Sequence, residues 1–320
     1  MAVPRIGEII DGYRFRGGDP ADENSWEKFD DVPKAGDILD GYVFKGGDPG
    51  VEASWEKPQS SGILRRAVAD PAISLLKGAV GVPEAVVGGL DIISGGRAGK
   101  ELEEVGFRPK EAKATLDTLL TPEQQEVSRR VQETKGFFPT IGAAVQNPST
   151  IVHSAIESLP SMGAGGVIGR GLLAVAPRVA PFAAAAVGEG AVSAGQSAEQ
   201  IRQATDGGLL TPGQSALAAG SGALTGLIGA GSGALAKKLG IADIDTWIAS
   251  GATQAARKQM ALRVIGGAVS EGLVEEMPQS MQEQVAQNVA LGKPWNEGVP
   301  EAGAMGALVG GVMGAGANLL

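Results

Sequence analysis

The stretch AGAMGALVGGVMGAGANLL, residues 302–320, is the clearest guide to the architecture, because it holds 19 residues without a charge and places a small residue at every fourth position. Residues 207–236, GGLLTPGQSALAAGSGALTGLIGAGSGALA, hold 30 uncharged residues and repeat this spacing. Residues four apart share one face of a helix, and small side chains there let two helix backbones approach closely. We therefore predict Gly/Ala-rich helices that associate through their small residues, above all Gly222, Gly226, Gly306, Gly310 and Gly314.

Working outward from these segments, the remainder beyond residue 63 also favours helices. It lacks the period-two alternation of half-buried strands, and helix-start signals recur at Thr121-Pro122 and Thr211-Pro212. Glycine contributes 50 of the 320 residues and aromatics only 4%, so packing partners and not helix propensity must hold the helices. The predicted helices cover 63–79, 82–93, 109–118, 122–135, 140–146, 149–158, 164–176, 179–205, 213–239, 243–265, 267–276, 278–291 and 298–318.

The first sixty residues contain a tandem repeat. Residues 7–28 read GEIIDGYRFRGGDPADENSWEK and residues 36–57 read GDILDGYVFKGGDPGVEASWEK, so that 15 of the 22 aligned positions are identical. Tyr-x-Phe alternates as a short strand does, and Gly-Gly-Asp-Pro indicates a turn. One interpretation is a linker of low stability with two sticky spots. The other is a docking element that binds a partner through its aromatic residues, which are Tyr13, Phe15, Trp26, Tyr42, Phe44 and Trp55.

These observations give a mostly α-helical chain with a flexible, repeat-bearing N-terminal arm. The predicted divisions are an acidic arm (1–60), an amphipathic helical region (61–160), Gly/Ala-rich apolar helices (161–240), and amphipathic helices that end in an apolar Gly/Ala helix (241–320). A helix over 214–236 would be about 34 Å long, which is enough to cross a bilayer core. Tight packing of soluble helices is the alternative for these weakly hydrophobic segments. The start of the sequence lacks the apolar stretch of a signal peptide.

Composition excludes much enzyme chemistry. The formal charge is −9, which is unfavourable for non-specific nucleic-acid binding. Cysteine is absent and His153 is the one histidine, so Cys-ligated metals, thiolate nucleophiles and multi-histidine sites are excluded. Two GxGxxA matches, at 169–174 and 231–236, follow no predicted strand and therefore fail the context of a dinucleotide site. Glu157-Ser158 matches a fragment of the lytic transglycosylase signature, whose remaining elements are missing. We predict no catalytic residue, no cofactor and no metal.

The repeat GYRFRGGDPADENSWEK resembles an element of the large internal virion proteins of tailed bacteriophages, especially short-tailed ones. The segment 271–317, with its Gly292-Lys293-Pro294-Trp295 turn, and PSMGAGGVIGRG at 160–171 are similar to the same family. The resemblance implies a protein carried inside the capsid and ejected with the genome into the host envelope. It implies self-association into a DNA conduit, contacts with other ejection proteins and the host membrane, and DNA contact only by passage.

Two alternatives remain at the level of sequence. One is a pore-forming, toxin-like membrane protein that is not part of a virion. The other is a fragment of a peptidoglycan-cleaving glycosidase that uses Glu157. Many members of the resembled family are much longer and carry a transglycosylase or polymerase domain, neither of which the sequence shows.

Overall fold

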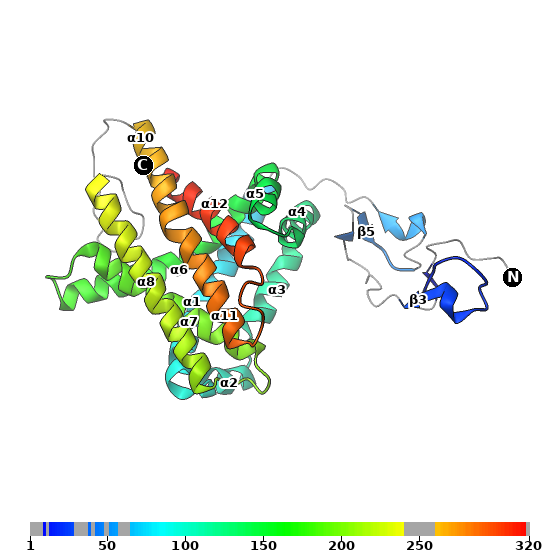
Figure 1. Ribbon diagram of the computed structural model, residues 1–320, viewed down its shortest axis with the longest axis horizontal. Coiled ribbons are helices and arrows are strands. Elements are labelled where there is room, and N and C mark those ends of the chain that lie inside the picture. The colour runs from blue at the N-terminus through cyan, green and yellow to red at the C-terminus, as the bar shows by residue number, and fades with distance from the viewer. Residues whose placement is uncertain are drawn as a thin grey trace.

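The computed structural model describes residues 9–10, 13–28, 38–39, 42–47, 51–56, 65–239 and 260–317. Long helices dominate these residues, and two small β-sheets precede them (Figure 1). The mostly α-helical class that the sequence predicts is therefore confirmed.

Each copy of the repeat forms a three-stranded antiparallel sheet. The first sheet joins β1 (Ile9–Ile10), β2 (Tyr13–Phe15) and β3 (Trp26–Lys28), and the second joins β4 (Ile38–Leu39), β5 (Tyr42–Phe44) and β6 (Trp55–Glu56). Phe15 lies opposite Trp26, and Phe44 lies opposite Trp55, with ring centroids 5.0 Å apart in both sheets. The predicted Tyr-x-Phe strand is present in both copies, and the two other strands of each sheet, one before it and one at the Trp-Glu segment, were not predicted.

The connection between β2 and β3 depends on two glycines. Gly17 and Gly18 have φ of 98° and 111°, a region that residues with a Cβ rarely adopt. A Cβ on Gly18 would also lie 2.7 Å from Ser25 Oγ. The Asp22 carboxylate then accepts a hydrogen bond from Asn24 N at 2.9 Å and caps the short helix η1 (Glu23–Ser25). In the second copy, η2 (Glu52–Ser54) follows Gly46 and Gly47, which also have positive φ.

The helices follow from Arg65 onward. In chain order they are η3 (Arg65–Ala69), α1 (Asp70–Ser94), α2 (Arg97–Glu104), α3 (Pro109–Leu119), α4 (Pro122–Glu133), α5 (Phe137–Gln146), α6 (Pro148–Val175), α7 (Pro181–Ala204), α8 (Pro212–Leu239), α10 (Met260–Val269), η4 (Ser270–Glu276), α11 (Met277–Ala290) and α12 (Val299–Ala317). The segments η3 and η4 are π-helical, and a proline lies two residues beyond each of them, at Pro71 and Pro278. A π-helix has wider turns than an α-helix, and it typically occurs close to a proline, which lacks the backbone N–H of the regular hydrogen-bond ladder.

Two predicted helix starts have the expected caps. At α4, the Thr121 hydroxyl accepts from Gln124 N at 3.4 Å. At α8, Thr211 Oγ1 accepts from Gln214 N at 3.2 Å, and Gln214 Oε1 accepts from Thr211 N at 2.8 Å. This reciprocal pair is a capping box, which satisfies two backbone donors that the first helical turn leaves unpaired.

The predicted breaks at two prolines are wrong. The predicted pairs 63–79 with 82–93 and 149–158 with 164–176 are the single helices α1 and α6, which continue through Pro83 and Pro160. An internal proline costs about 3 kcal/mol, but Gly78 of α1 packs on the backbone of Glu157 and on the Pro160 ring, so the α1–α6 contact offsets this cost. We did not predict α2, whose sequence is mostly charged. Most of the predicted helix 243–265 lies outside the described residues.

The helix contacts are backbone contacts at glycine. Helix α7 lies against α1, α6 and α8, while α12 lies against η4, α10 and α11 (Figure 1). A Cβ on Gly88 of α1 would lie 2.7 Å from the carbonyl carbon of Gly195 in α7. A Cβ on Gly188 of α7 would lie 2.7 Å from the carbonyl carbon of Gly165 in α6. Only helices with small residues at these points can pack this closely.

The interior is unusually polar. Among the described helices, alanines make up much of the buried apolar surface, and many large apolar side chains are exposed. Fully buried side chains include Asp91, Glu199, Arg202, Glu275 and Asn288. Because buried charges are stable only when they are paired or hydrogen-bonded, the interior depends on its polar network.

Candidate functional site

Two hollows lie between the long helices. The first has a volume of about 460 Å³ and is lined mainly by α1, α6, α7, η4 and α11, with contributions from α3 and α8. The second has about 650 Å³ and shares part of its wall with the first. The shared residues are Ser154, Ser158, Ser193, Gln196, Gln200, Glu276, Ser280 and Glu283. Because the two hollows share this wall, we treat them as one central cavity.

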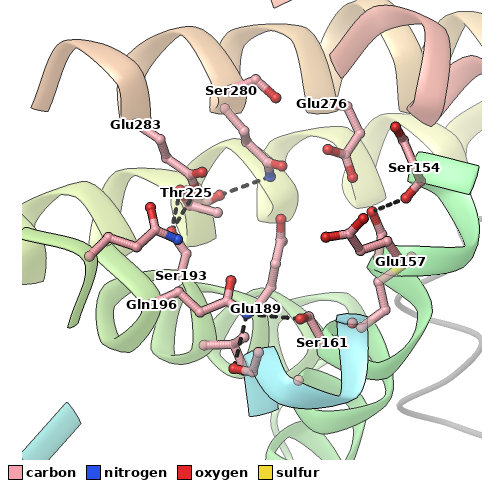
Figure 2. Close-up of a pocket in the computed structure, with 18 of the residues that line it drawn as sticks. Ser154, Glu157, Ser161, Glu189, Ser193, Gln196, Thr225, Glu276, Ser280 and Glu283 are labelled. Atoms are coloured by element: carbon pink, nitrogen blue, oxygen red, sulfur yellow. Dashed lines mark hydrogen bonds between the residues drawn. The ribbon is translucent and has the colours of Figure 1, made fainter. Parts of the chain in front are cut away.

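Helical spacing places the polar side chains of the central cavity. Residues three or four apart lie on one helix face, and three helices turn such a face inward (Figure 2). The inward residues are Ser154, Glu157 and Ser161 of α6, then Glu189, Ser193 and Gln196 of α7, and Glu276, Ser280 and Glu283 of η4 and α11. Figure 2 shows the carboxylates of Glu157, Glu189 and Glu276 directed into the space between these helices.

Glu283 is a half-buried carboxylate of the cavity that accepts two hydroxyl hydrogen bonds. Ser193 Oγ of α7 donates to its Oε1 at 2.5 Å, and Thr225 Oγ1 of α8 donates to the same oxygen at 2.8 Å. Burial raises the pKa of Glu283, although the two hydroxyl donors act in the opposite direction. The side chain therefore binds a proton more readily in the folded protein than in water.

Amide side chains extend the polar network to the other helices. Gln196 Nε2 donates to Ser161 Oγ of α6 at 2.8 Å and to the Gly81 carbonyl of α1 at 3.2 Å. Gln282 Nε2 of α11 donates to Thr225 Oγ1 at 2.7 Å. Ser232 of α8 also donates to the buried carboxylate of Glu275. These bonds join α1, α6, α7, α8, η4 and α11 through polar groups, in addition to a small apolar cluster of α7, α8 and α11 that includes Ile201, Ala218 and Ala290.

The lone histidine lies outside the central cavity. His153 Nδ1 and Ser74 Oγ form a hydrogen bond of 2.7 Å between α6 and α1. Burial lowers the pKa of His153, so the neutral ring is favoured. Within the described residues, no group of three or more His, Asp or Glu side chains is arranged to hold a metal ion.

Glu157, the residue on which the glycosidase alternative depends, lies at the edge of the cavity. Its Oε2 is 3.2 Å from Lys77 Nζ, and Lys77 also pairs with Asp117 at 2.7 Å.

The predicted docking aromatics divide into buried and exposed members. Phe15 and Phe44 are buried inside their sheets, and Trp26 and Trp55 are half-buried against them. Trp26 Nε1 donates to the Pro20 carbonyl at 2.9 Å. Tyr13 and Tyr42 are 46% and 45% exposed. The structure thus places four of the six rings in the folding of the repeat and leaves the two tyrosines available to a partner.

The predicted association glycines lie at contacts between helices of one chain. Gly222 and Gly226 of α8 face α7, where a Cβ on Gly226 would lie 2.6 Å from the Ala186 carbonyl oxygen. Gly306, Gly310 and Gly314 of α12 face α10, η4 and α11. A Cβ on Gly310, for example, would lie 2.8 Å from the Glu271 carbonyl oxygen. Association between copies of the chain stays a prediction.

Sequence reasoning did not find the central cavity. By sequence, Glu271, Glu275 and Glu276 are typical of a solvated acidic face, but Glu271 and Glu275 are buried and Glu276 lines the cavity. The signal was present in α7 and α11, where Ser, Gln and Glu recur at helical spacing within segments that we judged by their apolar residues. Comparison with models of protein families, with curated proteins and with solved structures finds no match.

Proposed function

We propose that this chain is a structural protein of a tailed-phage virion, packaged inside the capsid and ejected with the genome. In the host cell envelope, copies of the chain form or line an oligomeric conduit for DNA delivery. The proposal includes no catalytic residue and no cofactor. DNA passes through the conduit without specific binding.

The observation that carries the proposal is the distribution of polar and apolar side chains in the helical body. Carboxylates, hydroxyls and amides line the central cavity, while large apolar side chains such as Leu227 and Val312 lie on the outside. Large exposed apolar patches mark surfaces that contact other proteins or membranes. This arrangement suits helices that meet lipid or further copies on their outer faces.

The resemblance of the repeat to phage internal virion proteins supports the virion half of the proposal. The close glycine contacts suit the membrane half, because small-residue helices pack tightly where lipid removes the hydrophobic drive for association. In this proposal, residues 1–60 form a flexible arm that docks on other ejection proteins through Tyr13 and Tyr42. Residues 61–160, 161–240 and 241–320 form the Gly/Ala-rich helical assembly.

More than one segment of the chain supports the proposed contact with a membrane. The sequence favours the segments 207–236 and 302–320 for membrane contact. Of the described helices, one is long and apolar enough to cross a membrane by length and composition, and this helix covers Arg65–Ser94. We therefore propose that α1 joins α8 and α12 at the membrane.

Mass spectrometry of purified virions tests the proposal against its rival. The proposal predicts peptides of this chain in intact particles, and in the host envelope fraction after adsorption. A pore-forming protein that is not part of a virion shares the apolar exterior, but would be absent from particles at every stage. Absence from particles would overturn the proposal in favour of that rival.

A further inference from the structure

Helix α1 turns an unbroken apolar surface outward. Between Arg66 and Arg97, every exposed residue is apolar. We name these residues the α1 stripe, and they are Ala67, Val68, Ala72, Leu75, Leu76, Ala79, Pro83, Val86, Leu90 and Ile93. Val86 is 62% exposed and Ile93 is 86% exposed. At 1.5 Å per residue the stripe is about 39 Å long.

The ionisable residues of α1 all lie on the opposite face. Asp70, Lys77, Glu84 and Asp91 recur at intervals of seven residues, which places them on one side of the helix. Asp70, Glu84 and Asp91 are buried, and Lys77 is half-buried. Helix α1 is therefore amphipathic in the inverted sense, with its charges inside and its apolar side chains outside.

Partners on four other elements fix the charged face. Asp70 accepts from Thr121 N at 3.0 Å and from Thr121 Oγ1 at 2.6 Å. Lys77 pairs with Asp117 of α3, and Glu84 pairs with Lys113 of the same helix. Asp91 Oδ1 accepts from Gly99 N of α2 at 2.7 Å, and its Oδ2 lies 3.3 Å from Arg202 Nε of α7. Rotation of α1 to hide the stripe would break these contacts and leave buried charges unpaired, which is costly.

We propose that the α1 stripe is the surface on which the protein binds a lipid bilayer, with the stripe among the acyl chains and α1 parallel to the membrane plane. This inference rests on the proposed function and names the lipid-contacting surface within it. The in-plane orientation follows from α3, which packs on α1 and exposes Lys110 and Glu111. Because α3 could not enter the hydrocarbon, α1 inserts on one side only, to a depth of about 5–10 Å.

Two observations favour lipid over a second copy of the chain. The stripe exposes no polar side chain, whereas an interface between proteins carries about one hydrogen bond per 100–200 Å². In addition, the first exposed charged residue beyond either end of the stripe is an arginine: Arg97 at one end, and at the other Arg66, which also pairs with Glu123 at 2.9 Å and keeps 48% of its side chain exposed. Guanidinium groups match the phosphates of lipid headgroups in charge and geometry.

The absence of cysteine allows a site-specific test in the full chain. Val86→Cys is labelled with an environment-sensitive NBD fluorophore and mixed with vesicles of phosphatidylethanolamine and phosphatidylglycerol. Val145→Cys on α5, a valine that is 58% exposed and lies outside the stripe, is the matched control. We expect a blue shift and quenching by acyl-brominated lipid for the probe at 86, and neither effect for the probe at 145.

Charge substitution supplies the second measurement. We expect Leu90→Glu to lower the vesicle partition coefficient more than about tenfold, because the variant loses the leucine contact with the acyl chains and its new carboxylate resists desolvation. Val145→Glu should leave partition unchanged, and circular dichroism verifies that both variants fold.

Vesicle binding with an unchanged probe at 86 would overturn this inference alone. A probe that shifts with protein concentration in the absence of lipid would show that a second copy covers the stripe. Failure of the unaltered chain to bind vesicles would overturn both this inference and the membrane half of the proposed function.

Discussion

Substitution of two glycines in α8 tests the role of backbone contact between helices. Gly220 and Gly222 lie two residues apart in the same helix, so alanine gains the same helix propensity at both, about 1 kcal/mol. A Cβ on Gly220 would meet no atom within 4 Å. A Cβ on Gly222 would lie 2.5 Å from Ala194 Cβ and 2.7 Å from Ala194 N of α7.

The magnitude follows from these distances. Carbon atoms in contact prefer about 3.5–4.0 Å, so Gly222→Ala must move α8 away from α7 by roughly 1 Å at this point. Overpacking of this kind costs about 1–3 kcal/mol. We expect Gly220→Ala to raise the free energy of unfolding by about 1 kcal/mol. The free energy of unfolding of Gly222→Ala should be lower than that of Gly220→Ala by about 1–3 kcal/mol.

Urea unfolding followed by circular dichroism measures the difference. The comparison is made between variants, since the unfolded chains differ only in the position of one methyl group. If Gly222→Ala stabilised the protein as much as Gly220→Ala does, the close approach of α7 and α8 would be refuted.

Three further predictions concern the polar interior and the helix caps. Arg202→Met should destabilise the protein by about 3–5 kcal/mol, because the Arg202 side chain is 1% exposed and pairs with Glu199 at 2.7 Å. Arg130→Met, at a side chain that is 57% exposed, should cost less than about 1 kcal/mol. Equal losses of unfolding free energy for the two variants in urea titrations would contradict this prediction. Glu283 binds its proton more tightly in the folded protein, so its stabilising contribution is complete below the ordinary glutamate pKa and is lost as pH rises through the raised pKa. Glu283→Gln should therefore flatten the dependence of the unfolding free energy on pH between the ordinary glutamate pKa and the raised pKa, and an unchanged slope there would contradict the raised pKa of this carboxylate. Thr211→Ala should cost about 1 kcal/mol by loss of the capping box, and Thr211→Ser should restore most of it in thermal melts.

Much of the helical fold could be predicted from local chemistry. The starts of α4 and α8 follow from a threonine that caps the helix, a proline at the first helical position and a glutamine in the capping box. The strand at Tyr13–Phe15 follows from alternation. These features depend on residues close in sequence, so the sequence alone contains enough information.

The failures share a physical cause, which is compensation at long range. Pro83 and Pro160 indicate breaks, but Gly78 brings α1 and α6 together so closely that both helices continue. Glu271 and Glu275 are typical of a solvated face, and burial is tolerated because Ser232 and other neighbours on distant helices complete the network. The central cavity depends on pairings of this kind between α7, α8 and α11, which no local pattern specifies.

The α1 charges show that a longer pattern was present. Four ionisable residues at intervals of seven indicate one charged face, and the apolar residues between them indicate the other. What the sequence could not establish is which face turns inward. The answer comes from Lys113 and Asp117 of α3, which pair with Glu84 and Lys77 and hold the charged face inside.

The most direct test of the account is electrical conductance across a planar bilayer of phosphatidylethanolamine and phosphatidylglycerol after addition of the full chain. The account predicts discrete, reproducible steps of ion conductance, because an oligomer with a polar lining and an apolar exterior opens a hydrated path. Membranes that stay electrically sealed while labelled protein is bound to them would contradict the conduit.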